Sequence, residues 1–195
     1  MENSQSTKEF FNKIAEKWDT MCHHDQDKIA AILTFADLKQ GNRILDIATG
    51  TGILIPYLLQ AEPEVVVAID LSDQMIVQAQ KKYQEPTVYF EVADFYDLTE
   101  NGFDFAIAYS AYPHFPDKDA FSKKMAACLK PNGRFMIAHS ESRETINGRH
   151  AGDDVKKVSG LLKEAKEESR YFRSDFDIDI LVDTDELYIL SGKKR

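Results

Sequence analysis

The sequence predicts an α/β protein with a doubly wound sheet of seven strands. Most of these strands are expected to be parallel, with an antiparallel C-terminal hairpin and a helical N-terminal cap. Short apolar runs alternate with helix-compatible stretches from residue 43 onward, and the two last strands have a different pattern. We expect one domain over residues 1–195, with the cap over about residues 1–40 and the sheet core over 41–195.

The first 40 residues carry two helix patterns. Ser6 followed by Glu9 has the spacing of a capping box, which predicts that the first helix begins there. Apolar residues then recur at helical spacing as far as Trp18, and a second helix ends near the turn at Gly41. We expect these helices, over about residues 6–38, to cover a functional site.

Five short apolar segments predict the parallel strands, and two further segments predict the hairpin. The first five are RILDIA (43–48), VVVAID (65–70), TVYFEV (87–92), FDFAIAY (103–109) and GRFMIAH (133–139). Near-continuous apolar strands separated by helices are typical of a parallel sheet covered on both faces. A further helix is expected around residues 153–167. After it, FDIDILV (176–182) alternates with period two and DELYILSG (185–192) follows a short acidic turn, which predicts antiparallel pairing.

The composition and charge of the chain indicate which classes of binding partner are disfavoured. The chain has 33 acidic and 24 basic residues and a net charge of −9, which argues against binding to nucleic-acid phosphates. Cys22 and Cys128 have no metal-ligand spacing and suit a reducing compartment. The polar first residues carry no secretory signal, and the apolar runs are too short for a membrane span. We therefore expect a cytoplasmic monomer or homodimer without membrane or nucleic-acid partners.

The segment ATGTG (48–52) follows the first parallel strand, and ligands of open parallel sheets bind beyond the carboxyl ends of the strands. Gly50 and Gly52 let the backbone approach a ligand closely. No lysine follows Gly52 as a P-loop requires, and Ile55 stands where a dinucleotide fingerprint needs glycine or alanine. Asp46 would repel a pyrophosphate but attract the ammonium and sulfonium groups of S-adenosylmethionine. The turn therefore predicts a cationic nucleoside without phosphate.

The next two strand ends agree with this ligand. Asp70 follows the turn by about twenty residues, where an acid can accept the ribose hydroxyls. Asp94 can accept from the adenine amine, and Phe95 can offer its backbone N–H and its ring. The complete set of expected cofactor-binding residues is Trp18, Asp46, Ala48, Gly50, Thr51, Gly52, Asp70, Leu71, Asp94, Phe95 and Tyr109.

With these residues the chain resembles the class I S-adenosylmethionine-dependent methyltransferases over most of its length. The matching segments are Asp46 with ATGTG, AIDLSDQMI, VADFYDL, and CLKPNGRFMI before the fifth strand. The terminal hairpin is similar to the sixth and seventh strands of that family. FFNKIAEKWD resembles the opening of the ubiquinone/menaquinone C-methyltransferase group, where a tyrosine usually stands at the position of Trp18. The resemblance implies a Rossmann-like fold, S-adenosylmethionine as cofactor and methyl transfer (EC 2.1.1.-).

One departure from the family concerns the first glycine of its loop, which is Ala48 here. Because the alanine side chain is small, we expect tighter packing rather than lost binding, unless residue 48 requires a positive φ.

The chemistry of methyl transfer suggests roles for several side chains. Trp18 and Tyr109 are candidates to stabilise the sulfonium by cation–π attraction. The segment YSAYPHFPD (109–117) lacks the Asn/Asp-Pro-Pro-aromatic motif of base and glutamine N-methylases, which disfavours those substrates.

The side chains expected to act on the acceptor follow the fourth and fifth strands. Tyr112 and His114 are candidate bases or substrate contacts, and His139 at the end of the fifth strand is a candidate catalytic residue. In the polar stretch beyond it, the residues that could clamp or orient an anionic substrate are Glu141, Arg143 and His150.

Several alternatives stay open. The segment MCHHD brings Cys22, His23, His24 and Asp25 together, but adjacent histidines point apart on a regular element, so we expect no metal site. A small-molecule methyltransferase is favoured. A protein methyltransferase and a non-catalytic S-adenosylmethionine sensor or scaffold are the competing hypotheses. A dehydrogenase would require Asp46 to point away from the ligand.

Overall fold

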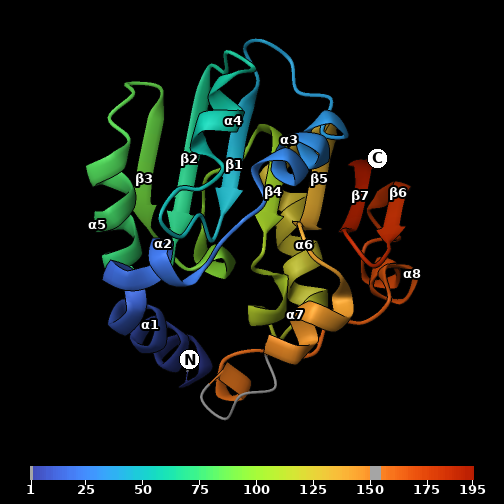
Figure 1. The fold of residues 1–195 in the computed structure, drawn as a ribbon. Helices are drawn as coiled ribbons and strands as arrows, with labels where there is room; N and C mark the ends of the chain where they lie inside the picture. The colour runs from blue at the N-terminus through green and yellow to red at the C-terminus, as the bar shows by residue number, and fades with distance from the viewer. Residues whose placement is uncertain (1, 150–154) are drawn as a thin grey trace.

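The computed structural model describes residues 2–149 and 155–195, which form one mixed seven-stranded sheet with helices on both faces (Figure 1). The strand order is β3-β2-β1-β4-β5-β7-β6. Strands β1 to β5 pair in parallel, and β7 runs antiparallel to both β5 and β6. The predicted fold class is confirmed. The strands are β1 (Arg43–Ile47), β2 (Val65–Asp70), β3 (Val88–Val92), β4 (Phe103–Tyr109), β5 (Leu129–His139), β6 (Phe176–Asp183) and β7 (Tyr188–Lys194).

The N-terminal elements are α1 (Glu2–Ile14), the 3₁₀ turn η1 (Ala15–Lys17), α2 (Trp18–Met21) and α3 (Gln26–Thr34). Of these, α1 and α2 lie at the carboxyl ends of the central strands, whereas α3 packs against one face of the sheet (Figure 1). The expected start of the first helix at Ser6 is wrong, because α1 already begins at Glu2. Tertiary contacts stabilise this extra turn: Ser4 Oγ donates to Asp94 Oδ2 at 3.0 Å.

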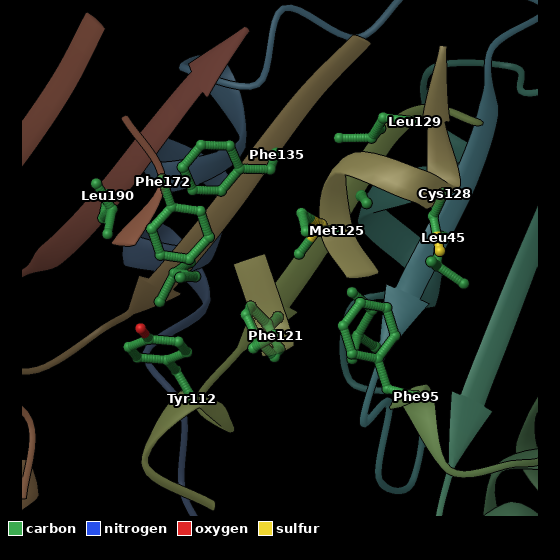
Figure 2. Close-up of a cluster of buried hydrophobic side chains, with 14 of the residues drawn as sticks. Leu45, Phe95, Tyr112, Phe121, Met125, Cys128, Leu129, Phe135, Phe172 and Leu190 are labelled. Carbon is green, nitrogen blue, oxygen red and sulfur yellow. The ribbon is translucent and has the colours of Figure 1, made fainter. Parts of the chain in front are cut away.

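Alternating residues of β1 enter two separate cores, one on each face of the sheet. Ile44 faces the core that α3 and α4 (Ile55–Leu59) cover. Leu45 faces the opposite core, which contains Phe121 of α6 (Lys118–Cys128) and the aromatic rings drawn in Figure 2. There the rings of Phe135 and Phe172 stack with centroids 4.5 Å apart and planes 10° apart. The period-two pattern of the parallel strands therefore supports a layer of helices on each face.

The remaining helical elements connect the strands and border the site. They are α5 (Asp73–Lys82), η2 (Phe95–Asp97), η3 (Tyr112–His114), α7 (Arg143–Arg149), η4 (Val155–Lys157), α8 (Ala165–Glu168) and η5 (Ser169–Tyr171). Within residues 2–149 and 155–195, no helix is both long and apolar enough to cross a bilayer.

The helix expected around residues 153–167 is wrong over 158–164, where the chain is irregular. Hydrogen bonds to other parts of the fold replace helical ones in this segment. The N–H of Gly160 donates to the carbonyl of Pro113 at 2.8 Å. The side chain of Asn147 binds both the N–H and the carbonyl of Leu162, at 2.8 and 2.9 Å. The segment is thereby held against η3 and α7.

Candidate active site

A cavity of about 110 Å³ lies where the carboxyl ends of β1, β2 and β4 meet the N-terminal helices. The order in which the chain adds strands reverses between β1 and β4: β2 and β3 follow on one side, and β5 on the other. Open α/β sheets bind ligands at this point. The residues lining the cavity are Thr7, Phe11, Trp18, His24, Ala48, Thr49, Gly50, Ile53, Asp70, Met75, Tyr109, Ser110, Ala111, His114 and Phe115.

Asp70 presents its carboxylate to this cavity in a fixed orientation. The N–H of Gly50 donates to Oδ2 and the N–H of Ser72 donates to Oδ1, both at 2.8 Å. Each oxygen keeps a lone pair, so the carboxylate can accept two further hydrogen bonds from a diol. Burial raises the pKa of Asp70 to about 6.

Asp46 does not border the cavity, contrary to the expectation that it faces the ligand directly. Its side chain is 1% exposed and accepts a hydrogen bond from Thr49 Oγ1 at 2.6 Å. Burial, together with the nearby charge of Asp70, raises the pKa of Asp46 to about 7. Asp46 therefore lies beneath the glycine turn, and Asp70 is the acid that faces the cavity.

These raised pKa values predict that folding stability falls as pH rises. Below about pH 7 the folded state keeps a proton on Asp46 that the unfolded chain already loses near pH 4. Unfolding then releases a proton, which lowers the free energy of unfolding by up to about 1.4 kcal/mol per pH unit in this window. We expect the free energy of unfolding of Asp46→Asn, relative to that of the wild type, to be higher at pH 7.5 than at pH 5. Urea unfolding at both pH values measures this difference. A stability difference that is the same at both pH values would contradict this prediction.

Ala48 has a φ of +55°, in the left-handed region that favours glycine. Tighter packing at residue 48 was expected only if its φ was not positive. Because φ is positive, the backbone of Ala48 is strained instead. We expect Ala48→Gly to raise the free energy of unfolding by about 1 kcal/mol, because alanine in this region costs roughly that amount. The matched control is Ala31→Gly on the exposed face of α3, which should lower it by a similar amount. Destabilisation by both substitutions would contradict the assigned strain.

Aromatic side chains of the cap close over the glycine turn. The indole Nε1 of Trp18 lies 3.9 Å from the position that a Cβ on Gly50 would occupy. The ring of Phe11 meets Trp18 edge-on with centroids 5.7 Å apart, and it meets His114 in the same way at 5.0 Å. These contacts give the cavity an aromatic wall suited to a cation.

A polar clamp fixes the cap to the sheet. Asp19 of α2 accepts from Thr51 Oγ1 at 2.5 Å and from Lys82 Nζ at 2.8 Å. Thr51, expected to contact the cofactor, therefore uses its hydroxyl to hold the cap. Gly52 is required by its surroundings, because φ is +85° and a Cβ would lie 2.9 Å from the ring of Tyr83.

His24 belongs to the cavity, although sequence reasoning considered it only as a metal ligand. Its Nδ1 lies 3.0 Å from the hydroxyl of Tyr109, which donates to Ser140 Oγ at 2.7 Å. Burial lowers the pKa of His24 and raises the pKa of the Tyr109 hydroxyl above its usual range. Both groups are then neutral near pH 7 and can face a cation without repelling it. The segment MCHHD indicated that polar side chains lie in this part of the cap, but it did not indicate that His24 contacts Tyr109.

Leu71 and Asp94 border a separate hollow on the other side of α1. Asp94 accepts from Ser4 Oγ and from the N–H of Tyr96, both at 3.0 Å. The side chain of Phe95 is 3% exposed and packs against Phe121 with centroids 5.0 Å apart. Of the expected adenine-binding residues, Asp94 is thus bound by Ser4 of α1, and the side chain of Phe95 lies in the core.

Of the three candidate catalytic residues, the structure brings only His114 to the cavity. Tyr112 is fully buried within the aromatic core (Figure 2), and its hydroxyl donates to Glu168 Oε2 at 3.1 Å. Burial and the Glu168 carboxylate raise the pKa of Tyr112 far above its usual range, so the interpretation of this phenol as a base is wrong. His139 is 2% exposed, packs edge-on against Tyr188, and does not border the cavity.

The polar residues Glu141 and Arg143, which follow β5, do not line the cavity. Arg143 forms ion pairs with Glu144 and Asp183 at 2.8 and 3.2 Å, and Glu141 pairs with Arg149. The expected clamp by Arg143 is therefore not formed, and His150 lies outside the described residues. Over residues 2–149 and 155–195, no group of three potential metal ligands comes together.

Comparison with known proteins agrees with this geometry. Residues 44–133 match the family described as "Methyltransferase domain". An uncharacterized methyltransferase of Schizosaccharomyces pombe is 31% identical over 161 residues, which are 69% of this chain and 54% of that protein. The chain thus spans about half the length of that relative.

Two solved structures share the fold. The [4+2]-cyclase SpnF has a TM-score of 0.79 at 16% identity, covering 98% of this chain and 96% of that chain. Phosphoethanolamine N-methyltransferase 2 of Haemonchus contortus, in complex with S-adenosyl-L-methionine, has a TM-score of 0.70 at 19% identity, covering 89% of this chain and 45% of that chain.

The sheet order and the glycine turn at its switch point define a Rossmann-like class I methyltransferase scaffold. Residues 44–133 belong to the methyltransferase domain family, and the fold of the chain is that of class I S-adenosylmethionine-dependent methyltransferases.

Proposed function

We propose that the chain transfers a methyl group from S-adenosylmethionine to a small-molecule acceptor, giving S-adenosylhomocysteine. The observation that carries this proposal is the position of the cap. Phe11, Trp18 and His24 close the cavity from above, opposite the strand ends. A chamber covered in this way admits a small nucleophile more readily than a side chain on a folded protein.

The residues of the cavity fit the cofactor. The carboxylate of Asp70, held by two backbone N–H groups, would accept the ribose hydroxyls. The faces of Trp18 and Tyr109 and the neutral ring of His24 would surround the cationic end. When bound, S-adenosylmethionine supplies an electrophilic methyl group on its sulfonium.

Binding of the whole nucleoside requires α1 to move. The cavity of about 110 Å³ is well below the usual 300–1,000 Å³ of ligand pockets, and Asp94 lies on the far side of α1. In this structure the hydroxyl of Ser4 donates a hydrogen bond to one carboxylate oxygen of Asp94. An adenine amine would take the place of that hydroxyl, so cofactor binding should be coupled to a shift of the first turns of α1.

His114 is placed to accept a proton from the acceptor. Its Nδ1 lies 2.9 Å from the carbonyl of Val158, and because a carbonyl only accepts, Nδ1 carries the proton and Nε2 the lone pair of the neutral ring. The same hydrogen bond fixes the ring in the wall of the cavity. Orientation of the acceptor against the methyl group supplies much of the rate, since positioning can contribute roughly 7–11 kcal/mol.

A screen with a labelled methyl donor tests the proposal. The full chain would be incubated with pools of small-molecule nucleophiles and, separately, with a protein mixture. We expect label in small molecules together with equimolar S-adenosylhomocysteine. Label confined to proteins would identify a protein methyltransferase instead. Tight cofactor binding without turnover on any acceptor would favour a sensor or scaffold.

A further inference from the structure

A second cavity lies directly beside the first, and His114 lines both. It has a volume of about 380 Å³ and is bounded by the loop after β4, the start of α6 and the segment 156–163. The N–H of Gly160 and the carbonyl of Val158 bind to this loop at Pro113 and His114, so the walls are held together. The cavity therefore has a defined shape at the edge of the proposed active site.

The charge of this cavity is opposite to that of the whole chain. Among the described residues, four lysines line it, at positions 118, 156, 157 and 163, together with one acid, Glu168. Glu168 is 1% exposed and already accepts from the hydroxyl of Tyr112. In a protein with a net charge of −9, a concave surface lined by four lysines concentrates a positive potential.

Lys118 is the side chain that most favours an anionic ligand. Its Nζ lies 3.6 Å above the ring of Tyr112 and donates to the carbonyl of the same residue at 2.8 Å. It forms no ion pair with any carboxylate of the described chain. Burial lowers the pKa of Lys118 to about 8, and the charge of Glu168 offsets only part of this effect. Lys163, in contrast, is paired with Glu167 at 2.8 Å.

We propose that this basic cavity is an acceptor subsite, in which Lys118 and Lys156 bind a phosphate or carboxylate group of the molecule that is methylated. This inference rests on the proposed function and adds the substrate class, a small anionic acceptor. Because His114 is shared, an acceptor anchored by its anionic group can extend its nucleophilic atom past His114 into the methyl-donor cavity. Lysine binds such groups as a point charge, so both oxyanions are compatible with the lining.

The test measures binding of inorganic phosphate and, in a parallel arm, acetate to the full chain by calorimetry. We expect Lys118→Met to weaken binding of the preferred anion by about 10-fold or more, as for loss of a charged hydrogen-bond partner. Lys156→Gln, an exposed position at low risk of misfolding, should weaken it several-fold. Lys123→Met, on the exposed side of α6, is the matched control and should bind the anion as the wild type does. The stronger of the two arms identifies the oxyanion class.

S-adenosylmethionine affinity is measured on each variant and should stay within about 2-fold of the wild type, which shows that the variants are folded. Equal anion binding by all variants, or no anion binding by the wild type, would overturn the subsite alone. Lysine-dependent anion binding without methyl transfer to any acceptor would overturn the proposed function, and the cavity would then be an anion-binding site without an acceptor role.

Discussion

Replacing Asp70 with asparagine is expected to weaken S-adenosylmethionine binding about 100-fold, because hydrogen bonds to a charged group contribute roughly 1.5–3 kcal/mol each. The carboxylate accepts the N–H groups of Gly50 and Ser72 and faces the cavity, so its remaining lone pairs are directed to the ligand. An amide of the same shape can accept at only one atom. The substitution also removes a negative charge from the lining of the cavity.

Calorimetry on Asp70→Asn and on Asp185→Asn measures this effect. Asp185 lies in the exposed turn between β6 and β7, so the same chemical change there should leave affinity unaltered. Because burial raises the pKa of Asp70 to about 6, wild-type affinity should fall as pH is lowered from 7.5 to 5. An unchanged dissociation constant in Asp70→Asn would remove this residue from the cofactor site.

Replacing His114 with glutamine is expected to lower kcat by about 100-fold or more, the range of general acid–base catalysis, on an acceptor whose nucleophile must lose a proton. His114 borders the cavity, and its Nδ1 is held by the Val158 carbonyl. Glutamine keeps a polar side chain but cannot accept a proton near neutral pH. Affinity for S-adenosylmethionine should stay within about 2-fold, because the residue is assigned to the acceptor.

The matched control is His23→Gln, in the exposed part of the cap, which should leave kcat and cofactor affinity unchanged. The measurement is steady-state kinetics with the acceptor found in the screen, together with a cofactor titration. Parallel losses of kcat and cofactor affinity in His114→Gln would assign this residue to the cofactor pocket or to folding.

The sheet and the acids near the strand ends were predictable from sequence because both depend on short local patterns. The spacing of apolar residues indicates the strands, and the acids directly follow them or lie near their ends. The hydrophobic pattern predicted the parallel strands and the hairpin. The distance of Asp70 from the glycine turn predicted its place at the ligand site. Which acid faces the ligand was not predictable. Asp46 and Asp70 lie in neighbouring strands, and only the structure shows that Asp46 is buried with its carboxylate bound to the Thr49 hydroxyl, whereas Asp70 borders the cavity.

The walls of the cavity away from the strand-end acids could not be predicted because long-range contacts build them. His24 and Tyr109 are 85 positions apart and meet only when the cap folds onto β4. Tyr112 and His114 are two residues apart on one short 3₁₀ turn, yet one enters the core and the other the cavity. The polar segment 158–164 favoured a helix locally, but Asn147 and Pro113 hold it open.

Fluorescence of Trp18 reports whether a cation-selective nucleoside site lies at the strand ends. Trp18 is the single tryptophan of the chain and lines the cavity beside Gly50, so cofactor binding should change its emission. We predict a saturable change on titration with S-adenosylmethionine and with S-adenosylhomocysteine, shifted to higher concentration in Asp70→Asn. We predict no saturable change with NAD⁺, because Ile55 stands where a dinucleotide-binding turn needs glycine or alanine. Saturation by NAD⁺ at lower concentration than by S-adenosylmethionine, or no response to S-adenosylmethionine, would contradict the account.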